Sequence, residues 1–321
     1  MAIFIVANAQ QRSLLMLLRE LAQNPKHRWL NNMVVIIAPN YNADGNDRMG
    51  LLNRPGQVGP IDGMGRRENA QNLDLNRDFM KIDSPEAQAL VGLMDQADPD
   101  LFIDCHTTNG SRHQYGLTYD IPHNPAVDSN IRDFMRVKMM PEVTRRMEEA
   151  GTLTFYYGNL NRDKTSWSTY GYEPRYSTEY GALRGRLTIL SEAYAYNSYR
   201  DRIMDSKKFV TTCLDYLHEN APAIQSLLQD VDERLIETAR TQPERVALSL
   251  AAKLTDFSEP VTIKGYDGDQ KVDLECQFFG RYKSTSTTPM PFAYLIPSNY
   301  SRQVDRLLKH GIVVEKLTEN V

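Results

Sequence analysis

The sequence of 321 residues has few cysteines, no strong excess of one charge and no long apolar run. Cys105, Cys213 and Cys276 are odd in number and far apart, which excludes a disulfide framework and a zinc site built from paired cysteines. The net charge is −4 with both signs interspersed, so no basic surface for nucleic acid or an anionic membrane is expected. A glycine-rich phosphate loop and a serine flanked by glycines are both missing, which counts against phosphoryl transfer and serine hydrolysis.

The apolar residues 1–7 lack a basic leader and are too short for a signal sequence or a membrane span, so we interpret them as a strand. A protein that begins on a core strand leaves a sheet edge uncovered, and we therefore expect the N-terminus to be incomplete. The chain also stops shortly after an expected strand, which suggests an incomplete C-terminus. Nothing in the sequence assigns a compartment.

With 41% hydrophobic residues the chain can bury a large core. Hydrophobic periodicity predicts alternating strands and helices, which indicates an α/β fold with binding sites at the carboxyl ends of strands. Strands are expected over 3–7, 33–38, 101–105, 152–157 and 187–190, and helices over 12–22, 83–96, 133–150 (kinked or split at Pro141) and 199–241.

Beyond Pro243 the pattern changes. Strands are expected over 246–254, 261–266, 272–279, 294–297 and 312–314, with a helix over 301–310. We therefore expect two domains, a large one over 1–240 and a small appended α/β module over 244–321.

Residues 39–79 form an irregular segment of about 40 residues, far longer than an ordinary connection, and such loops often carry function. Near its end the Arg77 guanidinium follows the Asn76 amide, a combination of donors that suits a carboxylate. The alternative is that Arg77 forms an ion pair within the loop, with Asp74 or Asp78.

His106 directly follows a short buried strand. Asp104 alternates onto the same face of that strand, so its carboxylate is placed to orient the imidazole. A single histidine is also common as a structural or surface residue, and that interpretation stays open here.

Glu192 ends another apolar strand. Partial burial at such a position raises the pKa of a carboxyl group toward neutrality, which suits a general base. The alternative is a solvated carboxylate or an ion pair with a neighbour such as Arg186.

Taken in order, these clusters resemble the carboxypeptidase A-like zinc metallopeptidases. The matching landmarks are Pro39-Asn40-Tyr41-Asn42-Ala43-Asp44-Gly45, Asp74-Leu75-Asn76-Arg77, Asp104-Cys105-His106 and Ser191-Glu192. The likeness covers roughly residues 1–205. It implies a zinc-carboxypeptidase-like fold, with a mixed, mostly parallel central sheet and helices on both faces, and the C-terminal module resembles an extension found in some bacterial members.

The resemblance implies that zinc is the cofactor, that His106 is the third zinc ligand, and that Glu192 is the base that deprotonates the zinc-bound water and then protonates the leaving amine. The family takes its first two ligands from a His-x-x-Glu sequence after the first strand. Here that strand leads into Asn8-Ala9-Gln10-Gln11-Arg12, and none of the other histidines is followed three residues later by glutamate. A tight catalytic zinc site needs three protein ligands, so activity of this chain itself is not expected.

For the substrate, the resemblance implies that Asn76 and Arg77 hold a C-terminal carboxylate, while Arg66 or Arg67 stabilises the oxyanion. The family's mobile capping tyrosine has two candidates here, Tyr176 and Tyr180. The expected partner is therefore a peptide or peptide-like molecule with a free C-terminal carboxylate.

Three functions remain open at this point. The first is a zinc-dependent metallocarboxypeptidase that removes C-terminal residues, represented here by a shortened sequence. The second is an inactive relative that binds peptide ends without cutting them. The third is an amidohydrolase of the same fold that acts on acylated amino acids. Members of the family are often secreted or periplasmic.

Overall fold

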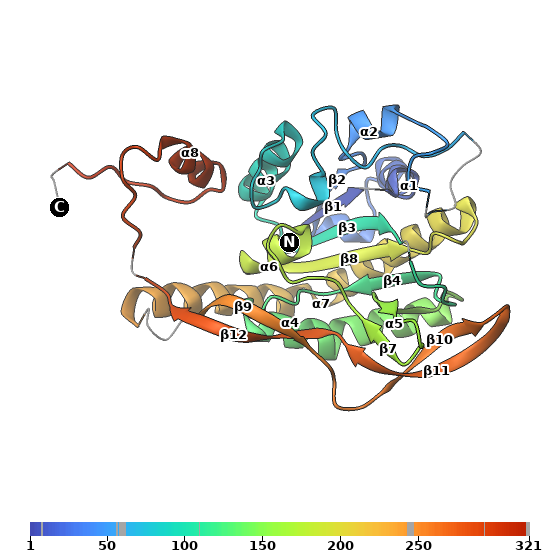
Figure 1. Ribbon diagram of the computed structural model, residues 1–321. Helices are drawn as coiled ribbons and strands as arrows, with labels where there is room; N and C mark the ends of the chain where they lie inside the picture. The colour runs from blue at the N-terminus through green and yellow to red at the C-terminus, as the bar shows by residue number, and fades with distance from the viewer. Residues whose placement is uncertain are drawn as a thin grey trace.

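The structure is a computed structural model that describes residues 1–7, 9–55, 57, 62–108, 110–242, 247–291 and 293–318. Its centre is a six-stranded sheet in the order β2-β1-β3-β8-β4-β5 (Figure 1). These strands are β1 (Ala2–Ala7), β2 (Val34–Ala38), β3 (Leu101–Thr107), β4 (Leu117–Asp120), β5 (Thr154–Tyr156) and β8 (Leu187–Ala193). Neighbours pair in parallel except β4 with β8, so the expected mixed, mostly parallel sheet is confirmed.

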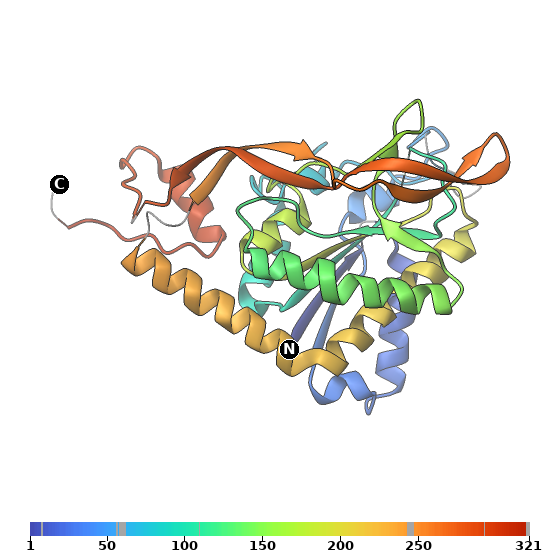
Figure 2. The same cartoon turned by 90° about the horizontal axis from the view of Figure 1, so that it is seen from below.

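Helices cover both faces of this sheet, as expected (Figures 1 and 2). They are α1 (Gln11–Gln23), α2 (Ala43–Asp47), α3 (Pro85–Ala97), α4 (Ser129–Phe134), α5 (Met140–Glu149), α6 (Ser177–Leu183) and α7 (Tyr199–Thr241), with 3-10 turns η1 (Arg28–Asn31) and η2 (Leu75–Arg77) and a π-helical segment η3 (Met135–Met139). No helix in the described part of the chain is both long and apolar enough to cross a membrane.

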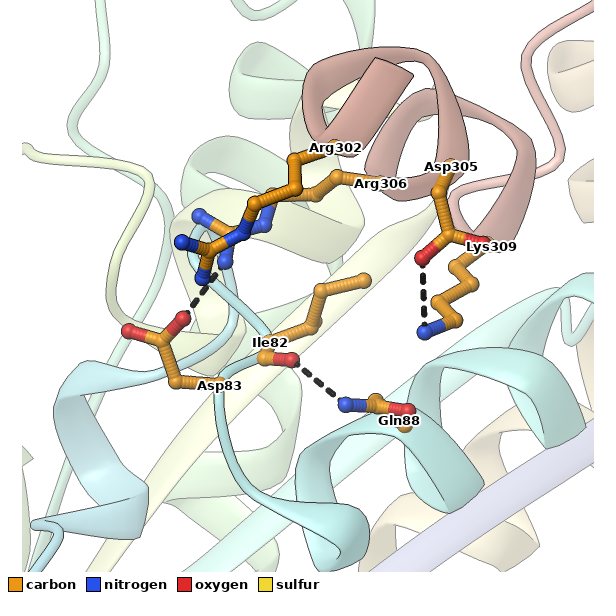
Figure 3. Close-up of a pocket in the computed structure, with 7 residues that line it drawn as sticks. All are labelled: Ile82, Asp83, Gln88, Arg302, Asp305, Arg306 and Lys309. Atoms are coloured by element: carbon orange, nitrogen blue, oxygen red, sulfur yellow. Dashed lines mark hydrogen bonds and ion pairs between the residues drawn. The ribbon is translucent and has the colours of Figure 1, made fainter.

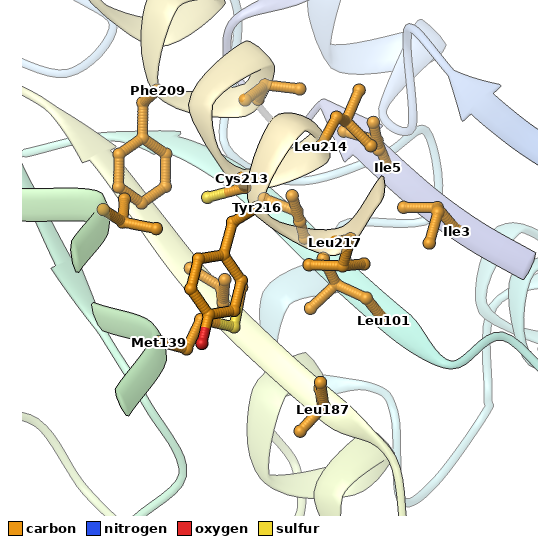
Figure 4. Close-up of a cluster of buried hydrophobic side chains, with 14 of the residues drawn as sticks. Ile3, Ile5, Leu101, Met139, Leu187, Phe209, Cys213, Leu214, Tyr216 and Leu217 are labelled. Atoms are coloured by element: carbon orange, nitrogen blue, oxygen red, sulfur yellow. The ribbon is translucent and has the colours of Figure 1, made fainter. Parts of the chain in front are cut away.

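Alternation along β1 divides the core in two. Ile3 and Ile5 pack beneath α1, α5 and α7, whereas Phe4 and Val6 pack on the opposite face beneath α3 and α6. Figure 4 shows the first face, where α7 lays apolar side chains such as Leu214 onto β1 and β3. Each face of the sheet therefore has its own packed layer.

The C-terminal strands join the rest of the chain through a shared sheet. The elements are β6 (Asn159–Leu160), β7 (Ser166–Ser168), β9 (Ala247–Thr255), β10 (Val261–Asp267), β11 (Gln270–Phe279), β12 (Arg281–Pro289) and α8 (Ser301–Lys309). One sheet has the order β10-β11-β7-β6, and β12 pairs with β9 in a long ribbon across one side of the molecule (Figure 2). Trp167 and Phe278 pack in one cluster. The division into 1–240 and 244–321 stays a prediction.

Two expected strands, over 294–297 and 312–314, are wrong. Neither segment has regular secondary structure, and the exposed fractions of Leu295 and Val313 are 71% and 84%. A short apolar run predicts a strand only where a neighbouring strand offers a free edge.

Pro141, expected to kink or split its helix, stands at the start of α5 directly after the π-helical segment, because proline has no N–H to continue the helical bonds.

Candidate functional site

His106 and Glu192 end adjacent parallel strands. They are register partners between β3 and β8, and partners in neighbouring strands point to the same face of a sheet. His106 Nε2 lies 3.0 Å from Asp104 Oδ1, and the Ser177 hydroxyl at the start of α6 donates to the other oxygen of Asp104. The expectation that Asp104 contacts and orients His106 is confirmed in this geometry, within a buried group.

The electrostatics of this pair follow from burial and charge. Burial raises the pKa of Glu192 to about 7, although His106, Arg67 and Arg54 oppose the rise. Burial lowers the pKa of His106, but the Asp104 carboxylate outweighs it and the net shift is upward. Glu192 Oε2 is buried and makes no hydrogen bond to the described residues. The carboxyl group can therefore exchange a proton near neutral pH.

The long loop brings arginines to this strand end. Arg67 interacts electrostatically with Glu192 and is itself fixed by Asp74, with Nε 2.7 Å from Oδ2. The Nη2 of Arg66 instead lies 3.8 Å from a carboxylate oxygen of Glu68. Of the two oxyanion candidates, Arg67 is therefore the one whose charge reaches Glu192.

Arg77 forms no ion pair within the described part of the chain. Its Nη1 donates to the carbonyl of Asn76 at 2.6 Å, and its guanidinium carbon lies 4.6 Å from the centre of the Tyr176 ring. The alternative of an ion pair with Asp74 or Asp78 is wrong, because Asp74 pairs with Arg67 and Asp78 accepts from the backbone N–H and the hydroxyl of Ser84. The positive charge of Arg77 is thus held in place by a ring and left without a carboxylate.

The position of Tyr180 does not suit the role of a mobile capping tyrosine. Its ring is buried beside Phe79, and its hydroxyl lies 2.9 Å from His310 Nδ1. Tyr180 belongs to α6, which packs on β8 at Thr188. Thr188 precedes Glu192 by four residues, a separation of roughly 13 Å along a strand. Tyr176, the other candidate, contacts Arg77 and remains a prediction for that role.

Two residues that sequence reasoning missed also reach the site. Arg54, in the irregular loop, interacts electrostatically with Glu192 and Arg67. Burial raises the pKa of Tyr157, and Glu192 raises it further, which places this tyrosine near the same carboxylate. Tyr157 directly follows β5, a position that the strand pattern could have indicated, but no local signal distinguished Arg54 from other loop arginines.

A separate cavity of about 180 Å³ opens between α8 and the segment before α3 (Figure 3). Arg302 and Arg306 reach toward Asp83 in it, with an Arg306–Asp83 ion pair, and Lys309 pairs with Asp305. None of the predicted site residues lines this cavity, so it is distinct from the strand-end site.

The described residues do not fit a catalytic zinc site. Among them no group of three or more histidine, cysteine, aspartate or glutamate side chains is arranged to hold a metal ion. Near the end of β1, where the resemblance expects two ligands, the Gln10 amide instead donates to Thr107 Oγ1 at 2.6 Å. One imidazole beside one carboxyl group falls short of the three protein ligands that zinc catalysis uses.

Among known proteins, this chain is similar to several solved structures. No family model matches the sequence, and no curated protein matches it. A metallo-carboxypeptidase from Pseudomonas aeruginosa in complex with (2-guanidinoethylmercapto)succinic acid is similar at 17% identity and a TM-score of 0.49, over 70% of this chain and 58% of that one. A putative carboxypeptidase A from Shewanella denitrificans is similar at 17% identity and a TM-score of 0.48, over 68% and 57%. This chain therefore spans less than two thirds of either protein.

Proposed function

We propose that this chain recognises the free C-terminal carboxylate of a peptide and binds it at Arg77. The observation that supports the proposal most directly is the state of Arg77, a guanidinium held over the Tyr176 ring with no carboxylate partner among the described residues. A planar guanidinium binds a carboxylate through two parallel hydrogen bonds, and the neighbouring Asn76 side chain adds a donor.

The surroundings support the same role. Arg67 is paired with Asp74, and its charge still acts on Glu192, so it adds positive potential at the strand end. With a pKa of about 7, Glu192 is partly neutral at physiological pH and repels an incoming carboxylate less than a fully ionised acid would. Because zinc does not fit the described residues, the proposal includes no hydrolytic step.

A second candidate is a metallocarboxypeptidase-type hydrolase that removes C-terminal residues, as the resemblance implies. The observation that favours it is Glu192, a buried carboxyl group with a pKa of about 7 beside His106. A base whose pKa lies near the working pH is suited to take a proton from water and return it to a leaving group.

Calorimetric titration of the full chain with N-acetyl-Gly-Ala and with its C-terminal amide tests the first proposal. We expect binding of the acid but not the amide, and a loss of roughly 10- to 150-fold in affinity in Arg77→Gln, since a hydrogen bond to a charged group contributes about 1.5–3 kcal/mol. Arg48→Gln, at an exposed arginine of the same loop, is the matched control. Equal binding of acid and amide would contradict the proposal.

The same peptide separates the two candidates. Release of free alanine by the unmodified chain in the presence of added zinc, abolished in Glu192→Gln, would favour the hydrolase. Binding without release, with or without zinc, is the result expected from a recognition protein.

A further inference from the structure

The loop over residues 50–64 is attached at two places to the strand-end site. Its ends close on each other through paired backbone bonds between Gly50 and Met64, at 3.0 and 3.1 Å. Its Gln57 amide donates to the carbonyls of Thr107 and Thr108, both at 3.0 Å. These two residues directly follow His106, so Gln57 is held against the carboxyl end of β3.

Arg54 lies between those two attachments and has an unusual backbone. Its φ is +53°, in the left-handed region that residues with a Cβ atom seldom adopt. The preceding Asn53 fixes this turn, because its side-chain amide donates to the carbonyls of Arg48 and Met64, both at 2.8 Å. A left-handed arginine held by its surroundings is the kind of strain that is common at ligand-binding positions.

The Arg54 side chain is partly buried. Among the described residues it has no ion pair and no hydrogen bond. Burial first, and then the positive charge of Arg67, lower the pKa of its guanidinium. Asp74 and Glu68, two carboxylates whose charge acts on Arg54, are already engaged, Asp74 by Arg67 and Glu68 by Arg66 at 3.8 Å. A partly desolvated cation beside another cation is favourable only when an anion joins it.

Two guanidinium groups therefore lie near the strand-end site. The charge of Arg54 acts on Glu192, and the charges of Arg77 and Glu192 both act on Tyr157. From this arrangement we infer that Arg54 binds a second acidic group of the ligand, so that the preferred ligands are peptides whose C-terminal residue has an acidic side chain. The inference rests on the proposed function, in which Arg77 takes the terminal carboxylate.

The test compares two peptides of nearly the same shape, N-acetyl-Gly-Glu and N-acetyl-Gly-Gln, by calorimetric titration at pH 7.5. We expect the unmodified chain to bind the glutamate peptide at least about tenfold more tightly, because only that peptide offers a partner to a second guanidinium. Arg54→Asn should lower the affinity for the glutamate peptide to that for the glutamine peptide. The affinity for the glutamine peptide should stay within about twofold of that of the unmodified chain. Asparagine suits the test because it tolerates the left-handed backbone of this position.

Arg54→Gly, which relieves the backbone strain, is a second variant in case the first folds poorly, and Arg48→Gln is the control for general loss of positive charge. Equal binding of the two peptides by the unmodified chain would overturn this inference and leave the proposed function standing. An equal loss of affinity for both peptides in Arg54→Asn would also overturn the inference, because Arg54 would then bind the terminal carboxylate. If neither peptide binds, both proposals fail.

Discussion

At the scale of single residues, the site depends on one buried carboxylate. Asp104 is fully buried, and its two oxygens accept from the His106 ring and the Ser177 hydroxyl. A buried carboxylate is tolerated only while such partners satisfy it. The orientation of His106 is therefore coupled to the start of α6, which lies more than 70 residues further along the chain.

We predict that Ser177→Ala lowers the free energy of unfolding by about 1–3 kcal/mol, because it removes a hydrogen-bond donor from a buried carboxylate. Urea denaturation followed by circular dichroism measures this change. Ser129→Ala, at an exposed position at the start of α4, should change stability by less than about 0.5 kcal/mol. A Ser177 variant as stable as the Ser129 variant would show that Asp104 does not need this bond.

At the scale of elements, α8 is attached to the body of the protein through His310. Its Nε2 lies 3.1 Å from the Met80 carbonyl, which can only accept, so Nε2 carries the hydrogen and Nδ1 accepts from the Tyr180 hydroxyl at 2.9 Å. Arg184 donates to the His310 carbonyl at 2.9 Å and pairs with Asp95. The neutral ring satisfies every one of these bonds.

We predict that α8 loosens as the pH falls. Burial lowers the pKa of His310, the Met80 bond opposes this, and the nearby cations Arg184 and Arg306 lower it further. Arg306 is itself paired with Asp83 across the cavity. The pKa of His310 is therefore lower in the folded state than its value of about 6.5 in the unfolded chain. Its contribution to the docking of α8 is complete at a pH above 6.5 and is lost as the pH falls below that value.

Hydrogen exchange of the amides of residues 301–309 measures this effect, after correction for the intrinsic rates at pH 7.5 and pH 5.5. Protection should fall at the lower pH in the unmodified chain, and His310→Ala should show low protection at both values. His218→Ala, at a half-buried histidine on α7, should behave like the unmodified chain. Undiminished protection at pH 5.5 would rule out His310 as the element that holds α8.

At the scale of the whole molecule, the question is whether the chain unfolds as one unit. Phe278 on β11 is buried and packs with Phe155 and Tyr156 on β5, at ring distances of 5.8 and 5.9 Å. We predict that Phe278→Ala costs about 3–5 kcal/mol and that the unfolding of α7 and of the C-terminal strands stays coincident, because Tyr156 packs against both the cluster of Phe278 and the cluster that contains the buried side chains of α7.

Denaturation monitored by tryptophan fluorescence and by circular dichroism provides the test. Trp167 lies in the same cluster as Phe278, and Trp29 lies against α7. Single-tryptophan variants therefore report on the two regions separately. Coincident transitions are expected. Two separate transitions, with only one shifted by Phe278→Ala, would instead support the division into domains 1–240 and 244–321.

The sequence alone determined the features that depend on local periodicity. The apolar runs at residues 3–7 and 101–105 predicted buried strands. The alternation of side chains along a strand also placed Asp104 on the same face as His106. The position of Glu192 at the end of an apolar strand predicted its raised pKa. These conclusions need no knowledge of distant contacts.

Only the tertiary structure decided which distant segments meet. It paired β11 with β7, placed the Tyr180 hydroxyl on His310 instead of at the strand end, and brought Arg54 to Glu192 from an irregular loop. None of these follows from periodicity, because an irregular loop has no repeating pattern and a strand does not encode its partner. The physical reason is that local preferences fix the elements, whereas burial and charge compensation across the whole chain select how the elements and loops come together.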